Sequence, residues 1–82
     1  METNNKSIIY LDKEVSIVQY LSESDSQFDM RLKYIKLLER NKVDCKEAIR
    51  LSKIWHCIKF KNCKYTPEVY YKVTSYEKKN NV

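Results

Sequence analysis

Three cysteines and one histidine are the side chains of this 82-residue sequence best suited to binding a metal ion or to nucleophilic chemistry. Cys45, His56, Cys57 and Cys63 could supply four zinc ligands, but the sequence contains no C-x-x-C pair. His56 adjoins Cys57, so on a helix these two side chains diverge by about 100°. We therefore expect no metal site and place the three thiols in or beside the core. An odd number of cysteines also fits a reducing compartment.

No other residue pattern in this sequence predicts catalysis. There is no glycine, which excludes a Gly-rich phosphate loop, a dinucleotide fingerprint and a nucleophile elbow. His56 has no readable nucleophile or carboxylate pair beside it, so we expect a partly exposed structural residue. The sequence thus predicts a protein that is not an enzyme, has no catalytic residues, and takes no cofactor and no small-molecule substrate.

Cationic side chains at helical spacing are the stronger signal. The formal net charge is +5, and it is unevenly distributed: residues 1–30 hold two cations against six acids, and residues 31–82 hold fourteen against five. Basic residues recur every three or four positions in two successive segments, which places each set on one helix face. These outer faces predict a nucleic-acid-binding surface made of Lys33, Lys36, Arg40, Lys46, Arg50, Lys53 and Lys61. An ordinary solvated face is the alternative.

Tyrosines near the C-terminus are a second signal. Tyr70, Tyr71 and Tyr76 lie among lysines, and tyrosine is common both at core edges and at protein interfaces. The alternative function is therefore a protein–protein interaction subunit that uses these tyrosines without touching nucleic acid. The sequence does not distinguish DNA from RNA, and it names no protein partner and no oligomeric state.

Helices are the elements expected to position these residues. Asp12 is a candidate cap, and Leu11, Val15, Val18 and Leu21 follow at helical spacing, which predicts a helix over residues 12–22. A second helix follows the polar stretch of residues 22–26 and stops near Asn41. Its apolar stripe consists of Phe28, Leu32, Ile35 and Leu38.

The third predicted helix has the clearest start. Asp44 and Glu47 read as a capping box, and the buried side would carry Ala48, Leu51 and Trp55. Its short connection to the preceding helix, at residues 41–43, predicts a helix-turn-helix pair. Residues 66–77 allow two readings. Thr66-Pro67-Glu68 favours a fourth helix, whereas the strand-forming residues 69–74 would suit a β-wing.

These elements predict one all-α or mostly α domain over residues 1–82. It consists of three compact helices with a helix-turn-helix pair, followed by the fourth helix or wing, with residues 1–6 and 78–82 frayed. The apolar runs are too short for a membrane span, and the N-terminus lacks the pattern of a signal peptide. We therefore expect no membrane association and an intracellular location, either cytoplasmic or nuclear.

Overall fold

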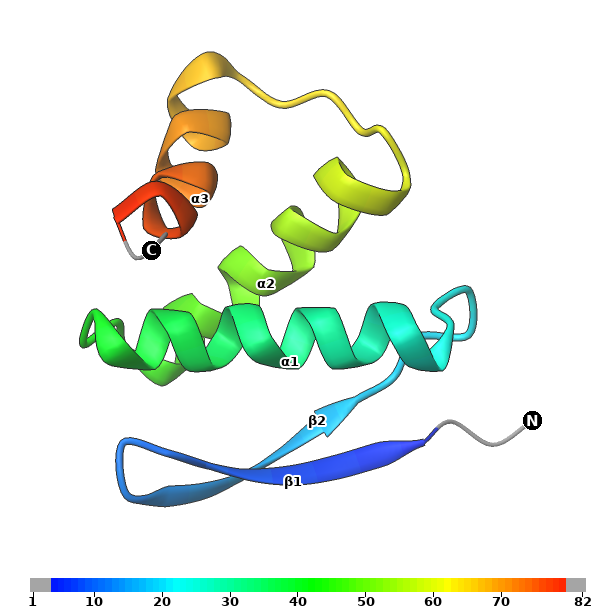
Figure 1. Ribbon diagram of the computed structural model, residues 1–82, viewed down its shortest axis with the longest axis vertical. Coiled ribbons are helices and arrows are strands. Elements are labelled where there is room, and N and C mark those ends of the chain that lie inside the picture. The colour runs from blue at the N-terminus through cyan, green and yellow to red at the C-terminus, as the bar shows by residue number, and fades with distance from the viewer. Residues whose placement is uncertain (1–3, 80–82) are drawn as a thin grey trace.

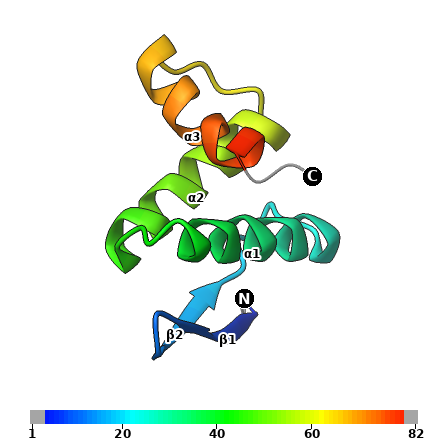
Figure 2. The ribbon, with the colours of Figure 1, turned by 60° about the vertical axis from the view of Figure 1, so that its left-hand side comes forward.

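The computed structural model describes residues 4–79, which form a two-stranded antiparallel sheet and three helices (Figure 1). In chain order these are β1 (Asn5–Tyr10), β2 (Lys13–Val18), α1 (Asp25–Arg40), α2 (Cys45–Phe60) and α3 (Pro67–Lys79). The helix α1 lies between the hairpin and α3, and α2 crosses it (Figures 1 and 2). The fold is a small mixed α/β arrangement, so the predicted all-α three-helix domain is wrong.

A β-hairpin occupies most of the segment predicted as a helix over residues 12–22. The strands are joined by Leu11 and Asp12, both at positive φ (48° and 67°), as a type I′ turn requires. Side chains alternate across the hairpin, which places Ile17 in the core and leaves Val18 exposed. The apparent helical stripe is therefore not a buried face, and Leu21 at its end is 69% exposed.

Side chains of α1 hold both edges of this hairpin. Lys36 Nζ donates to the Ile9 carbonyl of β1 at 2.8 Å, and Arg31 Nη2 donates to the Val18 carbonyl of β2. The turn between the strands also bonds to α1, because the Leu11 N–H donates to Glu39 Oε2 at 2.6 Å. These bonds explain how a two-stranded sheet, which is marginal alone, is stabilised here.

The start and end of α1 follow from local sequence chemistry. Ser24 is the N-cap and forms a reciprocal capping box with Gln27. At the other end, Lys42 adopts a φ of 60°, and the Val43 N–H donates to the Leu38 carbonyl at 3.1 Å. Together with the bond from the Lys42 N–H to the Glu39 carbonyl, this is a Schellman motif built without glycine. The second predicted helix is thus confirmed.

The remaining two helices also begin where the sequence indicates. Asp44 caps α2 by accepting from the Lys46 N–H at 3.1 Å, whereas Glu47 forms ion pairs instead of completing a capping box. Thr66 Oγ1 accepts from the Val69 N–H at the start of α3. Residues 67–79 are therefore a helix, and the β-wing alternative is wrong.

The core lies where all these elements meet. Tyr10 and Ile17 of the hairpin, Phe28, Ile35 and Leu38 of α1, Leu51 and Trp55 of α2, and Val73 of α3 are buried. Of the terminal segments expected to fray, residues 5–6 belong to β1 and residues 78–79 to α3, and residues 1–3 and 80–82 lie outside the described residues. Within residues 4–79, no helix is long and apolar enough to cross a membrane.

Candidate functional site

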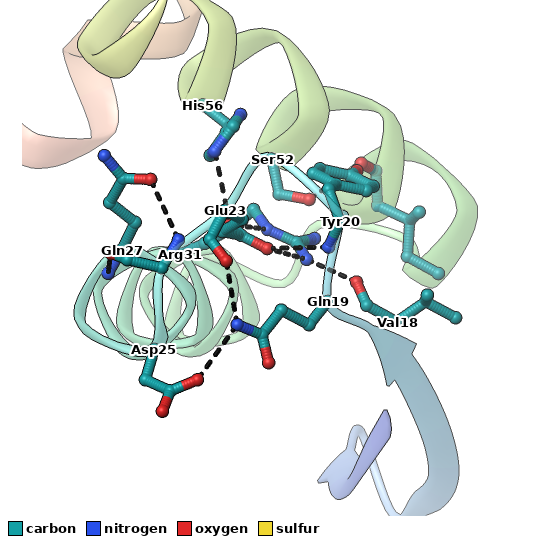
Figure 3. A network of polar contacts seen from close by, with 11 residues as sticks. Val18, Gln19, Tyr20, Glu23, Asp25, Gln27, Arg31, Ser52 and His56 are labelled. Atoms are coloured by element: carbon teal, nitrogen blue, oxygen red, sulfur yellow. Dashed lines mark hydrogen bonds and ion pairs between the residues drawn. The ribbon is translucent and has the colours of Figure 1, made fainter. Parts of the chain in front are cut away.

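A buried cluster of charged side chains lies where the hairpin, α1 and α2 meet (Figure 3). Glu23 precedes α1, Arg31 projects from α1 and His56 from α2, and each is at least 95% buried. Arg31 Nε donates to Glu23 Oε2 at 2.8 Å, and Arg31 Nη2 donates to Glu23 Oε1 at 3.0 Å. This two-point pairing is the geometry in which an arginine and a carboxylate can be buried together.

Further contacts complete the surroundings of Glu23 and Arg31. The Tyr20 N–H donates to Glu23 Oε1 at 3.1 Å, and the Arg31 guanidinium lies 4.2 Å from the centre of the Tyr20 ring. Gln19 Nε2 donates to the Glu23 carbonyl at 2.9 Å. The cluster therefore fixes the path of the chain from β2 into α1.

His56 is the least satisfied member of the cluster. Its Nε2 lies 3.4 Å from Glu23 Oε2 and makes no hydrogen bond with any described residue. Burial is the main cause that lowers the pKa of His56, with Arg31 acting in the same direction and Glu23 opposing it. The imidazole is consequently neutral near pH 7. The expectation that His56 would be partly exposed is wrong, since only 2% of it is accessible.

Glu23, Arg31 and His56 are almost fully buried, and Glu23 and Arg31 are paired with each other. Because these polar groups are used within the fold, we assign the cluster a structural role. The sequence does contain a signal for it that we missed. Arg31 lies three residues after Phe28 and four before Ile35, within the apolar stripe of α1, where a cation needs a buried acid.

The residues predicted to contact nucleic acid all lie on the surface, on two crossing helices and just beyond them. Those on α1 are Lys33, Lys36 and Arg40, those on α2 are Lys46, Arg50 and Lys53, and Lys61 follows α2. Their exposure agrees with the sequence pattern. The helices α1 and α2 cross (Figures 1 and 2), and each carries three of these cations.

Two of these cations already have carboxylate partners. Lys36 Nζ lies 2.6 Å from Glu39 Oε1, and Arg50 Nη2 lies 2.7 Å from Glu47 Oε1. Hydrogen bonds from Arg50 and Lys72 lower the pKa of Glu47 to about 2. Within residues 4–79, five of the seven make no ion pair, namely Lys33, Arg40, Lys46, Lys53 and Lys61.

The C-terminal tyrosines do not share one environment. Tyr70 is 51% exposed and Tyr71 is 68% exposed on α3, so both rings are accessible. Tyr76 is partly buried and packs against the core. Tyr70 and Tyr71 are thus surface residues that a partner could contact, whereas Tyr76 contributes to the packing of the core.

The cysteines offer no metal centre in the described residues. Cys45, Cys57 and Cys63 are free and half-buried, and residues 4–79 contain no group of three His, Cys, Asp or Glu side chains placed to hold an ion. Hydrogen bonding with Cys57 is the main cause that raises the pKa of the Cys63 thiol. The two thiols are neighbours at the end of α2.

The chain matches no known protein family, and comparisons with curated proteins and with solved structures give no significant match either.

Proposed function

We propose that this protein is a non-catalytic module that binds nucleic acid through exposed cations of α1, α2 and the segment after α2. The observation that carries the proposal is the absence of ion pairs, among residues 4–79, for Lys33, Arg40, Lys46, Lys53 and Lys61. A cation that has no carboxylate partner binds a phosphate without first breaking an internal ion pair.

Lys36 and Arg50 are weaker candidates within the predicted set. Each donates to a carboxylate of its own helix, Glu39 or Glu47, so its charge is already locally compensated. The proposed contact set is therefore narrower than the seven residues indicated by the sequence pattern.

Salt dependence tests this function. Five phosphate contacts predict that affinity for a 20-base-pair duplex falls by roughly 500-fold between about 50 and 200 mM KCl. The measurement is fluorescence anisotropy of a labelled duplex, repeated with a single-stranded oligonucleotide to distinguish the two kinds of nucleic acid. Absence of binding at the lower salt concentration, or an affinity that does not change with salt, would overturn the proposal.

Matched variants locate the contacts. The double variant Lys46→Gln, Lys53→Gln removes two contacts and should reduce the slope of log affinity against log salt by about 1.8. Lys13→Gln removes an exposed cation from the hairpin that forms no ion pair within residues 4–79, and it should leave that slope unchanged. A slope reduced by about 0.9 in Lys13→Gln, the same change per charge as in the double variant, would show that only net charge matters and would refute the assigned surface.

A protein-interaction subunit is the second candidate, favoured by the exposure of Tyr70 and Tyr71 on α3. The double variant Tyr70→Ser, Tyr71→Ser keeps the charge and serves in the same titration. Unchanged duplex affinity supports binding by the cations alone, whereas lost duplex affinity in a folded variant assigns these rings to the nucleic-acid contact.

A further inference from the structure

Two adjoining hollows mark the exposed side of α1. One, of about 390 Å³, lies among the three helices and is lined by Met30, Lys33, Tyr34, Leu37, Trp55 and Glu77. The other, of about 350 Å³, is lined by Leu32, Lys33, Lys36, Leu37 and Arg40. Lys33 and Leu37 line both, so the hollows adjoin each other along α1, and we call the two together the α1 groove. Each hollow falls at the small end of the range for ligand pockets.

The floor of the α1 groove is apolar and offers aliphatic contacts. Met30 is 46% exposed and lines the same hollow as Tyr34 and Trp55, and Leu37 is partly exposed. The Trp55 and Tyr34 rings stack on each other at 4.9 Å and are almost entirely buried. Their faces are therefore unavailable for stacking a nucleobase, which favours a ligand with aliphatic side chains.

Glu77, the acidic residue that lines the α1 groove, already has partners within the protein. Its Oε1 accepts from Trp55 Nε1 at 3.1 Å and lies 3.5 Å from Lys59 Nζ. The carboxylate thus stabilises the packing of α3 on α2, and its charge is locally balanced.

The rim of the α1 groove is positively charged. Lys33, Lys36 and Arg40 line it, and Lys33 and Arg40 form no ion pair with any residue that the structure describes. An apolar floor beneath such a rim is complementary to a segment that carries aliphatic side chains on one face and carboxylates beside them.

We propose that the α1 groove binds an acidic amphipathic helix of a partner protein, with aliphatic side chains inserted against Met30 and Leu37 and carboxylates paired with Lys33 and Arg40. This goes beyond nucleic-acid binding, because the apolar floor contributes nothing to a phosphate contact. The partner helix and nucleic acid would both contact Lys33 and Arg40, so we expect them to compete for these two cations of α1.

The test uses a pool of fluorescein-labelled 14-residue peptides in which Leu recurs at i, i+3, i+4 and i+7 and Asp or Glu fills the other positions. We expect peptides of the pool to bind at micromolar affinity and to shift the backbone amide resonances of Met30, Lys33 and Leu37. The same compositions in scrambled order, which lose the apolar face, should bind at least tenfold more weakly.

Substitutions separate this inference from the proposed function. Met30→Gln should weaken peptide binding by about tenfold and leave duplex affinity unchanged, because it removes apolar contact without altering charge. Ile49→Gln is the matched control: Ile49 is 40% exposed on α2 and lies outside the α1 groove, so peptide affinity should not change. Circular dichroism verifies that both variants fold.

Three results would overturn the inference. The first is that no peptide of the pool shifts the resonances of the α1 groove at millimolar concentration. The second is that ordered and scrambled peptides bind equally, which indicates charge attraction alone. The third is that Met30→Gln weakens duplex and peptide binding alike, which assigns the groove to nucleic acid. If the unmodified protein does not bind the duplex, only the proposed nucleic-acid function is refuted, and the inference about the α1 groove stands.

Discussion

Glu23→Gln is the substitution that tests the structure most directly. The side chain of Glu23 is inaccessible to solvent, and it pairs at two points with Arg31, of which 2% is accessible. Glutamine has nearly the same shape, so the change removes a charge without creating a cavity. It leaves the Arg31 guanidinium buried without its counter-ion.

The expected cost follows from the remaining contacts of Arg31. Breaking a buried ion pair on one side typically costs about 3–5 kcal/mol. Arg31 keeps its hydrogen bond to the Val18 carbonyl and its position over the Tyr20 ring, which places the expected loss near the lower value, about 3 kcal/mol. Since small domains are stable by about 5–15 kcal/mol, this is a large fraction of the total.

Urea denaturation measures the change, with Trp55 as the intrinsic reporter because it is the only tryptophan and is buried against Tyr34. A loss of about 3 kcal/mol lowers the midpoint by about 1–3 M. Asp29→Asn is the control: Asp29 pairs with Lys6 at 3.0 Å, but both side chains are more than half exposed. Its loss should cost less than about 1 kcal/mol.

A second change in the same background sharpens the test. Arg31→Met removes the uncompensated charge, so the double variant Glu23→Gln, Arg31→Met should be more stable than Glu23→Gln alone. The reasoning fails if Glu23→Gln costs no more than Asp29→Asn, or if the added Arg31→Met destabilises further.

Two other predictions concern acid stability and the glycine-free backbone. Glu47 has a pKa of about 2 in the folded protein against an ordinary value of 4.5, so its pairing stabilises the fold above pH 4.5 and this contribution disappears as pH falls to about 2. Urea midpoints across that range should therefore decline less steeply in Glu47→Gln than in the parent protein, and parallel slopes would contradict the pairing with Arg50 and Lys72. Lys42→Gly should raise the free energy of unfolding by about 1 kcal/mol, because a φ of 60° is costly for any residue with a Cβ atom. A lower urea midpoint for this variant would argue against the left-handed conformation at Lys42.

Cap residues and apolar periodicity were sufficient to predict α1 and α2, and they favoured a helix over a β-wing for α3. Asp44 and the Thr66-Pro67 pair mark helix starts through local hydrogen bonds, which depend little on the rest of the fold. The hairpin could not be found in this way. Its turn residues, Leu11 and Asp12, have positive φ values but lack the Asn-Gly signature, and the bond from the Leu11 N–H to Glu39 joins residues 28 positions apart.

The candidate site was predictable in part. Spacing correctly placed Lys33, Arg40, Lys46 and Lys53 on the surface, because exposure of charged residues follows from helical periodicity alone. Which cations carry carboxylate partners depends on side-chain geometry. The α1 groove depends on how three helices meet, which single-helix patterns do not encode.

The bonds from Lys36 and Arg31 to the hairpin have a consequence for assembly. Open strand edges invite the addition of a strand from another molecule, which is a common route to aggregation and domain swapping. Here the Ile9 carbonyl on one edge and the Val18 carbonyl on the other are already occupied by cations of the same chain. A visiting strand would have to displace Lys36 at one edge or Arg31 at the other, which disfavours edge-to-edge pairing between molecules.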